Sequence, residues 1–86
     1  MKHAGSAALD SLEPLLERLR AITALKERSR GVFYLKSRAF LHFHEDPTGL
    51  YADIRATDRD DFDRIAIGDP SSWDDLIATA SGAAER

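Results

Sequence analysis

The first third of the chain repeats apolar residues at intervals of three and four positions, the spacing of one stripe on an α-helix. This stripe consists of Leu9, Leu12, Leu16, Leu19, Ile22 and Leu25. Asp10 or Ser11 offers an N-cap, and Glu13 completes a capping-box pattern with Asp10. Pro14 then falls in the first turn, where its missing N–H costs little. The pattern predicts a helix over residues 11–28.

The middle of the chain changes to β-branched and aromatic residues, in short runs separated by turn signals. The runs predict three strands and a shorter fourth one, over residues 32–35, 38–45, 50–56 and 62–67. Lys36 and Ser37 form a tight turn between the first two strands. The next turn spans residues 46–49, where Pro47 presets φ and Gly49 tolerates the left-handed region.

The end of the chain predicts a second helix. Ser71 or Ser72 provides its N-cap, and Gly82 ends it. Its buried stripe consists of Trp73, Leu76, Ile77 and Ala80. The resulting order is α-β-β-β-(β)-α. Runs of strands between two helices indicate an α+β fold, in which both helices pack on one face of an antiparallel sheet.

The length of 86 residues leaves room for one small domain. We expect this domain over residues 9–82, with a disordered N-terminus over 1–8 and a frayed end over 83–86. With 43% apolar and 31% charged residues, the composition is that of an ordinary globular protein. Because the chain has no cysteine, neither a disulfide nor a thiolate zinc site is available, and the fold relies on packing alone or on a partner.

Targeting signals are not evident in the sequence. No apolar run approaches the roughly 18 residues that span a bilayer. The start, Met1 to Ser6, has one lysine and no apolar segment, which does not fit a signal peptide. Together with the lack of cysteine, this pattern predicts a cytoplasmic protein without a membrane association.

The two faces of the hairpin at residues 38–56 differ in character, because successive strand residues point to opposite sides. If the turn pairs Glu45 with Leu50, counting along the strands determines every other pair. The apolar face pairs Leu41 with Ile54 and Phe43 with Ala52. The other face pairs His44 with Tyr51, His42 with Asp53 and Phe40 with Arg55. A slip of one residue would mix the faces, so this register is strongly specified.

The polar face is the strongest candidate for a functional surface. It presents one contiguous patch of Phe40, His42, His44, Tyr51, Asp53 and Arg55. Exposed aromatic side chains beside an arginine favour a protein partner or a second copy of the chain. In such a homodimer, Phe33, Leu35 and Phe40 would contribute apolar area. The leading interpretation is a binding or protein-interaction module that works without a cofactor.

The same patch permits a metal site. His42 and His44 lie on one face about 7 Å apart at Cβ, and Asp53 provides a third ligand or orients His42. Two imidazoles and a carboxylate suit Zn²⁺, Ni²⁺ or non-haem Fe²⁺. His42 with Asp53 also resembles the base and orienting residue of a hydrolytic site, although no nucleophile falls nearby. A divalent metal site or a small hydrolytic enzyme is therefore the alternative.

The charge distribution bears on the choice of partner. The net charge is −3, but residues 1–43 have eight Lys and Arg against four Asp and Glu, and residues 44–86 have four against eleven. This asymmetry steers a partner if the halves are separate and cancels if they interleave. The overall acidity and the acidic run at residues 58–63 argue against nucleic acid.

The segment from Phe33 to Arg55 resembles small bacterial α+β proteins. The resemblance lies in an aromatic strand, a Lys/Arg turn, the run from Phe40 to His44 and the strand that follows from Leu50. In these features the chain is similar to MmcQ/YjbR-type domains and to the short bacterial domains called luciferase-like. The MmcQ/YjbR resemblance implies a frataxin-like helix–sheet–helix arrangement and a suspected DNA-binding role. The Lys-rich strand and loop of that family are missing here, so only the architecture is carried over.

Overall fold

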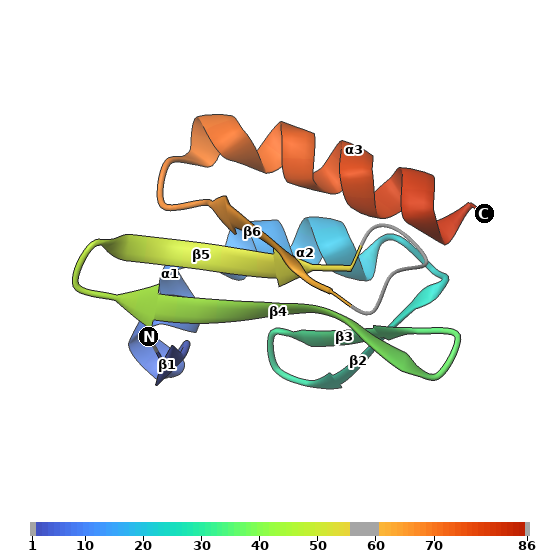
Figure 1. Ribbon diagram of the computed structural model, residues 1–86, viewed down its shortest axis with the longest axis horizontal. Coiled ribbons are helices and arrows are strands. Elements are labelled where there is room, and N and C mark those ends of the chain that lie inside the picture. Colours follow the sequence, from blue (N-terminus) through green and yellow to red (C-terminus); the bar gives the residue numbers. More distant parts are fainter. Residues whose placement is uncertain (1, 56–60, 86) are drawn as a thin grey trace.

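The computed structural model describes residues 2–55 and 61–85. Its strands are β1 (Lys2–His3), β2 (Leu25–Ser29), β3 (Val32–Leu35), β4 (Arg38–Asp46), β5 (Gly49–Ile54) and β6 (Asp63–Ala66). Its helices are α1 (Ser6–Ser11), α2 (Glu13–Arg20) and α3 (Trp73–Ala84), with the 3₁₀ turn η1 (Pro70–Ser72) before α3. Within the described residues the strands form one antiparallel sheet in the order β2-β3-β4-β5-β6, and β1 pairs with the end of β4 (Figure 1). The α+β class is confirmed.

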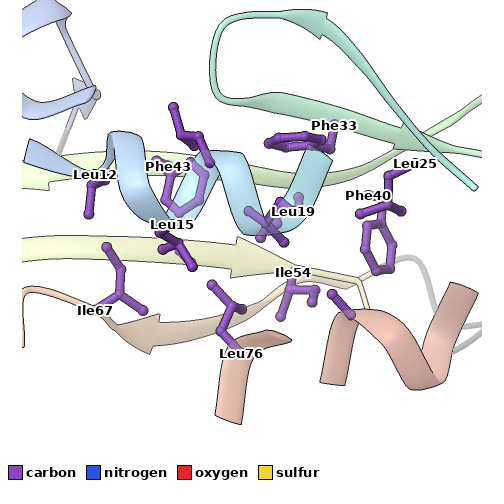
Figure 2. Close-up of a cluster of buried hydrophobic side chains, with 14 of the residues drawn as sticks. Leu12, Leu15, Leu19, Leu25, Phe33, Phe40, Phe43, Ile54, Ile67 and Leu76 are labelled. Atoms are coloured by element: carbon purple, nitrogen blue, oxygen red, sulfur yellow. The ribbon is translucent and has the colours of Figure 1, made fainter. Parts of the chain in front are cut away.

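The helices pack on one face of this sheet, where apolar side chains from both layers form a single core (Figure 2). Leu15, Leu16 and Leu19 of α2 are completely buried in it. The sheet and α3 contribute Leu41, Phe43, Ala52, Ile54, Leu76, Ala80 and Ala83. Removal of this apolar surface from water drives the association of the two layers. None of the helices within the described ranges is long and apolar enough to cross a membrane.

The predicted register of the central hairpin is confirmed. β4 and β5 pair Leu41 with Ile54, His42 with Asp53, Phe43 with Ala52, His44 with Tyr51 and Glu45 with Leu50. The tight turn between β3 and β4 is also confirmed, because Lys36 and Ser37 have φ values of +53° and +70°. Two consecutive residues with positive φ are typical of a two-residue hairpin loop.

The helix predicted over residues 11–28 is wrong at its start. The structure has two short helices, α1 and α2, which meet at Leu12. Pro14 has no N–H to donate to the carbonyl group of Asp10, so α1 does not continue into α2. Gly5 and Leu12 occupy the N-cap positions that the sequence assigned to Asp10 or Ser11.

The same prediction is wrong at its end, where residues 25–29 form the strand β2. Leu25 keeps its expected burial, but it pairs with Leu35 of β3 instead of completing a helical stripe. An apolar residue at position 25 fits both the apolar stripe of a helix and a buried position in a strand. Pairing with β3 therefore decides the conformation, which is a tertiary effect that overrides local propensity.

Both ends of the chain take part in the fold more than the sequence indicates. Residues 2–3 form β1 and residues 6–11 form α1, although a disordered N-terminus was predicted there. α3 continues past Gly82 to Ala84, because Ala83 packs in the core. Residues 56–60, which hold the end of the predicted third strand and the first half of the acidic run, lie outside the described residues.

The prediction that Phe40 lies on the polar face is wrong. Phe33 pairs with Leu41 and Tyr34 pairs with Ala39, so Phe40 is an extra residue in β4. Such a β-bulge places two residues of one strand opposite one residue of the other. Phe40 therefore points into the core and is only 3% exposed (Figure 2).

The bulge also changes the apolar surface that the sequence assigned to a homodimer. Phe33 and Phe40 are both buried in the core of the single chain. Leu35 is the remaining member of that set, and it is half-buried against the same core. These three side chains therefore stabilise the domain itself.

Candidate metal centre

Three imidazole rings meet on the face of the sheet that points away from the helices. His42 and His44 reach this face because they alternate along β4 with buried residues such as Phe43. His3 reaches it because β1 pairs with β4 and places His3 opposite His44. The chain has three histidines, so the fold gathers every one of its imidazoles into this three-histidine cluster.

The cluster is compact enough for one metal ion. The ring centroids lie 4.6 Å apart for His3 and His44, 4.9 Å for His42 and His44, and 5.7 Å for His3 and His42. One nitrogen from each ring can be chosen so that all three lie within 4.8 Å of one another. In a tetrahedral zinc site with Zn–N bonds of about 2.0–2.1 Å, ligand nitrogens lie about 3.3 Å apart. A modest inward rotation of the rings therefore closes the cluster around an ion.

The surroundings keep two of the rings in the form that metals bind. Burial lowers the pKa of His42, and the neighbouring His44 lowers it further. Burial also lowers the pKa of His44, against the opposing effect of the Asp53 carboxylate. Metal ions bind the neutral imidazole, so neither ring has to lose a proton near pH 7.

The same two rings each have a polar atom without a hydrogen bond. The Nδ1 atoms of His42 and His44 are buried and have no hydrogen-bond partner among the described residues. An unsatisfied buried polar atom costs about 1–3 kcal/mol. Native structures contain few such atoms, and those that occur often have a role in binding or catalysis. Coordination of one of these nitrogens, or a rotation that comes with coordination, would remove the cost.

Asp53 lies beside the cluster and is only 6% exposed. Its Oδ1 accepts a hydrogen bond from Nε of Arg64 at 2.8 Å, and its Oδ2 accepts one from Nη2 of Arg64 at 2.8 Å. The Arg64 guanidinium holds the pKa of Asp53 below its usual range. Oδ2 also lies 3.2 Å from Nδ1 of His44. Asp53 was predicted as a third ligand or as the orienting partner of His42; the structure places it against His44 and Arg64.

The other residues of the predicted patch lie at the margins of the cluster. Tyr51 pairs with His44 in the sheet register. The guanidinium carbon of Arg55 lies 4.6 Å from the centre of the Phe62 ring. Phe62 in turn lies 4.9 Å, centre to centre, from the ring of His42. Phe62 therefore forms an apolar wall on one side of the imidazoles.

Sequence reasoning missed His3, Phe62 and Arg64. His3 lies in a two-residue strand, which is too short to show a pattern. Arg64 falls within the predicted strand 62–67. The loop before this strand does not determine how it pairs with the predicted strand 50–56. Only the observed pairing of Arg64 with Asp53 brings the two side chains together.

The fold and the site define a small α+β domain with a three-histidine cluster on the open face of its sheet. Comparison with protein-family models, curated proteins and solved structures yields no match to this chain. The resemblance to MmcQ/YjbR-type and luciferase-like domains therefore stays a prediction. Function is accordingly inferred from the geometry of the cluster.

Proposed function

We propose that this domain binds one divalent transition-metal ion through His3, His42 and His44. The observation that carries the proposal is the convergence of all three histidines from two distant parts of the chain. His42 and His44 would share a face in any strand, but His3 adds a third imidazole through pairing of β1 with β4. Three imidazoles are the protein ligands of several zinc centres.

The donor set favours metals that prefer nitrogen ligands. Imidazole suits zinc, copper and nickel, whereas magnesium and calcium prefer carboxylate and carbonyl oxygens. Non-haem iron in a two-histidine, one-carboxylate site would need Asp53 as a ligand. Both oxygens of Asp53 already accept hydrogen bonds from Arg64. We therefore favour a three-histidine site for zinc, copper or nickel.

A metal bound to three protein ligands in tetrahedral geometry keeps a fourth position open. His3 is exposed, whereas His42 and His44 are half-buried, so the cluster opens toward solvent. The open position accepts water or a donor atom from another molecule. The predicted binding or protein-interaction module thus takes a narrower form, in which a partner would complete the coordination of the metal.

The test is calorimetric titration of the purified chain with zinc chloride. We expect one ion per chain, and His3→Ala, His42→Ala and His44→Ala should each weaken binding by more than about 100-fold, the upper end of what loss of an outer-shell partner costs. Lys2→Ala is the matched control for His3→Ala, because it changes the neighbouring exposed residue of the same strand. It should bind zinc like the parent.

The coordination itself can be checked with cobalt in place of zinc. Three nitrogen ligands and one water should give the intense visible bands of a tetrahedral cobalt centre, and each histidine variant should lose them. If the parent chain takes up no zinc, or if His42→Ala and His44→Ala bind it as the parent does, the proposed function is wrong.

A further inference from the structure

A buried carboxylate joins two strands directly beside the three-histidine cluster. Asp53 of β5 lies opposite Arg64 of β6, and the two side chains form a bidentate ion pair with both bonds at 2.8 Å. The same carboxylate lies 3.2 Å from Nδ1 of His44. One arginine, one carboxylate and one imidazole thus form a continuous chain of contacts that ends at the cluster.

This contact determines which nitrogen of His44 faces away from the carboxylate. A carboxylate held by an arginine accepts hydrogen bonds and donates none. Of the two tautomers of neutral His44, this carboxylate therefore favours the one that carries the ring proton on Nδ1. In that tautomer Nε2 has the lone pair that a metal ion binds.

We infer that Asp53, fixed in place by Arg64, is a positioning residue that directs Nε2 of His44 toward the metal. The inference rests on the proposed function, since it assigns a role at the same site. Nδ1 of His44 lies at ion-pair distance from Oδ2 of Asp53 but is not aligned as a hydrogen bond. Binding of the ion turns the ring, and the turned ring donates its Nδ1–H to Asp53. In metal-bound histidines the N–H of the second ring nitrogen commonly donates a hydrogen bond to a carboxylate in this way.

Arg64 has a second effect in this arrangement. Because it occupies both oxygens of Asp53, the carboxylate stays out of the coordination sphere. The Arg64 side chain is itself 49% exposed, whereas the Asp53 side chain is 9% exposed. Arg64→Gln leaves the buried Asp53 carboxylate without its ion-pair partner, so the free energy of unfolding of this variant is measured beside its zinc affinity.

The experiment compares the parent chain with Arg64→Gln and Asp53→Asn by zinc titration and by long-range ¹H–¹⁵N correlation spectra of the imidazoles. We expect Asp53→Asn to bind zinc about 10–100-fold more weakly than the parent. In Arg64→Gln the carboxylate is no longer fixed, so the expected signature of this variant is a changed His44 tautomer. In the zinc-bound parent, His44 should carry its proton on Nδ1 and the metal on Nε2. In the variants, the spectrum should show loss of this single tautomer.

Two control variants separate positioning from charge and from general stability. Asp75→Asn removes an exposed negative charge from the first turn of α3, on the other side of the sheet from the cluster. Arg28→Gln removes an exposed arginine that lies over an aromatic ring, Tyr34, away from the cluster. Both controls should bind zinc within about threefold of the parent, because neither removes an outer-shell partner of a ligand.

The outcomes distinguish the two proposals. If the parent binds zinc through its histidines while Arg64→Gln and Asp53→Asn retain its affinity and its His44 tautomer, the positioning role is wrong and the metal site stands. The positioning role is also wrong if zinc-bound His44 of the parent carries the metal on Nδ1. If the parent binds no zinc, both proposals fail. If Asp53→Asn does not fold, the His44 tautomer of zinc-bound Arg64→Gln tests the positioning role by itself.

Discussion

At the scale of single residues, Phe40 shows how one extra position in a strand changes the surface of the sheet. The bulge between β3 and β4 turns its ring from the polar face into the core. The polar face loses an aromatic contact surface, and the three-histidine cluster is left as its main feature. The ring then contributes to stability instead of binding.

Replacement of Phe40 by alanine should lower the free energy of unfolding by about 3–5 kcal/mol, because it leaves a cavity in the core. Urea unfolding followed by circular dichroism measures the loss. Phe62→Ala is the matched control on the opposite face, where the ring is half-buried, and should cost about 1 kcal/mol. If the alanine variant does not fold, Phe40→Leu should still show a loss of about 1 kcal/mol. Equal losses for Phe40→Ala and Phe62→Ala would contradict burial in the core.

At the scale of elements, β1 is the strand that completes the candidate site. It is held by its pairing with β4, and the amide of Ala4 donates to the carbonyl group of Phe43 at 3.0 Å. The amide of Gly5 donates to the side chain of Glu45 at 2.6 Å. A two-residue strand has few contacts of its own, so a metal ion shared by His3, His42 and His44 would strengthen its attachment.

Zinc should therefore slow hydrogen exchange at the amide of Ala4. If release of β1 breaks the site, exchange slows by up to about 100-fold when free zinc exceeds its dissociation constant 100-fold. Exchange followed by NMR with and without zinc measures this effect. His3→Ala provides the control and should show no slowing at Ala4. Slowing of equal size in parent and variant would mean that His3 does not link β1 to the metal.

At the scale of the whole molecule, a cluster of charges connects the helical layer to the edge of the sheet. Arg20 of α2 donates from Nε to Oε1 of Glu27 in β2 at 2.6 Å, and it also contacts Glu13 and Glu17. Arg30 donates to Glu13 at 2.8 Å. Hydrogen bonds from Arg30 and then Arg20 lower the pKa of Glu13 from 4.5 to about 2. Arg20 likewise lowers the pKa of Glu27.

This cluster should make the free energy of unfolding of the domain depend on pH in the acid range. The carboxyl groups have lower pKa values in the folded state, so their contribution is complete above pH 4.5 and disappears as the pH falls toward 2. Arg20→Gln should be less stable than the parent at pH 7. The difference in their free energies of unfolding should become smaller as the pH falls from 4.5 to 2. Urea midpoints across this range measure it. Arg18→Gln, which removes an exposed pair with Asp74, serves as the control. A constant difference down to pH 2 would contradict this role of the cluster.

Local patterns were sufficient for much of the fold and for part of the site. Alternation along β4 and β5, together with the turn at residues 46–49, predicted the register and the shared face of His42 and His44. These features depend on neighbouring residues and on a period of two, which a sequence displays directly. The apolar stripe of α2 was predicted for the same reason.

The tertiary structure alone decided the features that depend on how the strands pair. Residues 25–29 became a strand because they pair with β3 across a two-residue turn. Phe40 entered the core because the paired segments 33–35 and 38–41 differ by one residue. His3 and Arg64 joined the site through pairing with β4 and β5. The free energy of such pairing comes from contacts between strands, and the periodicity within one segment does not contain this information.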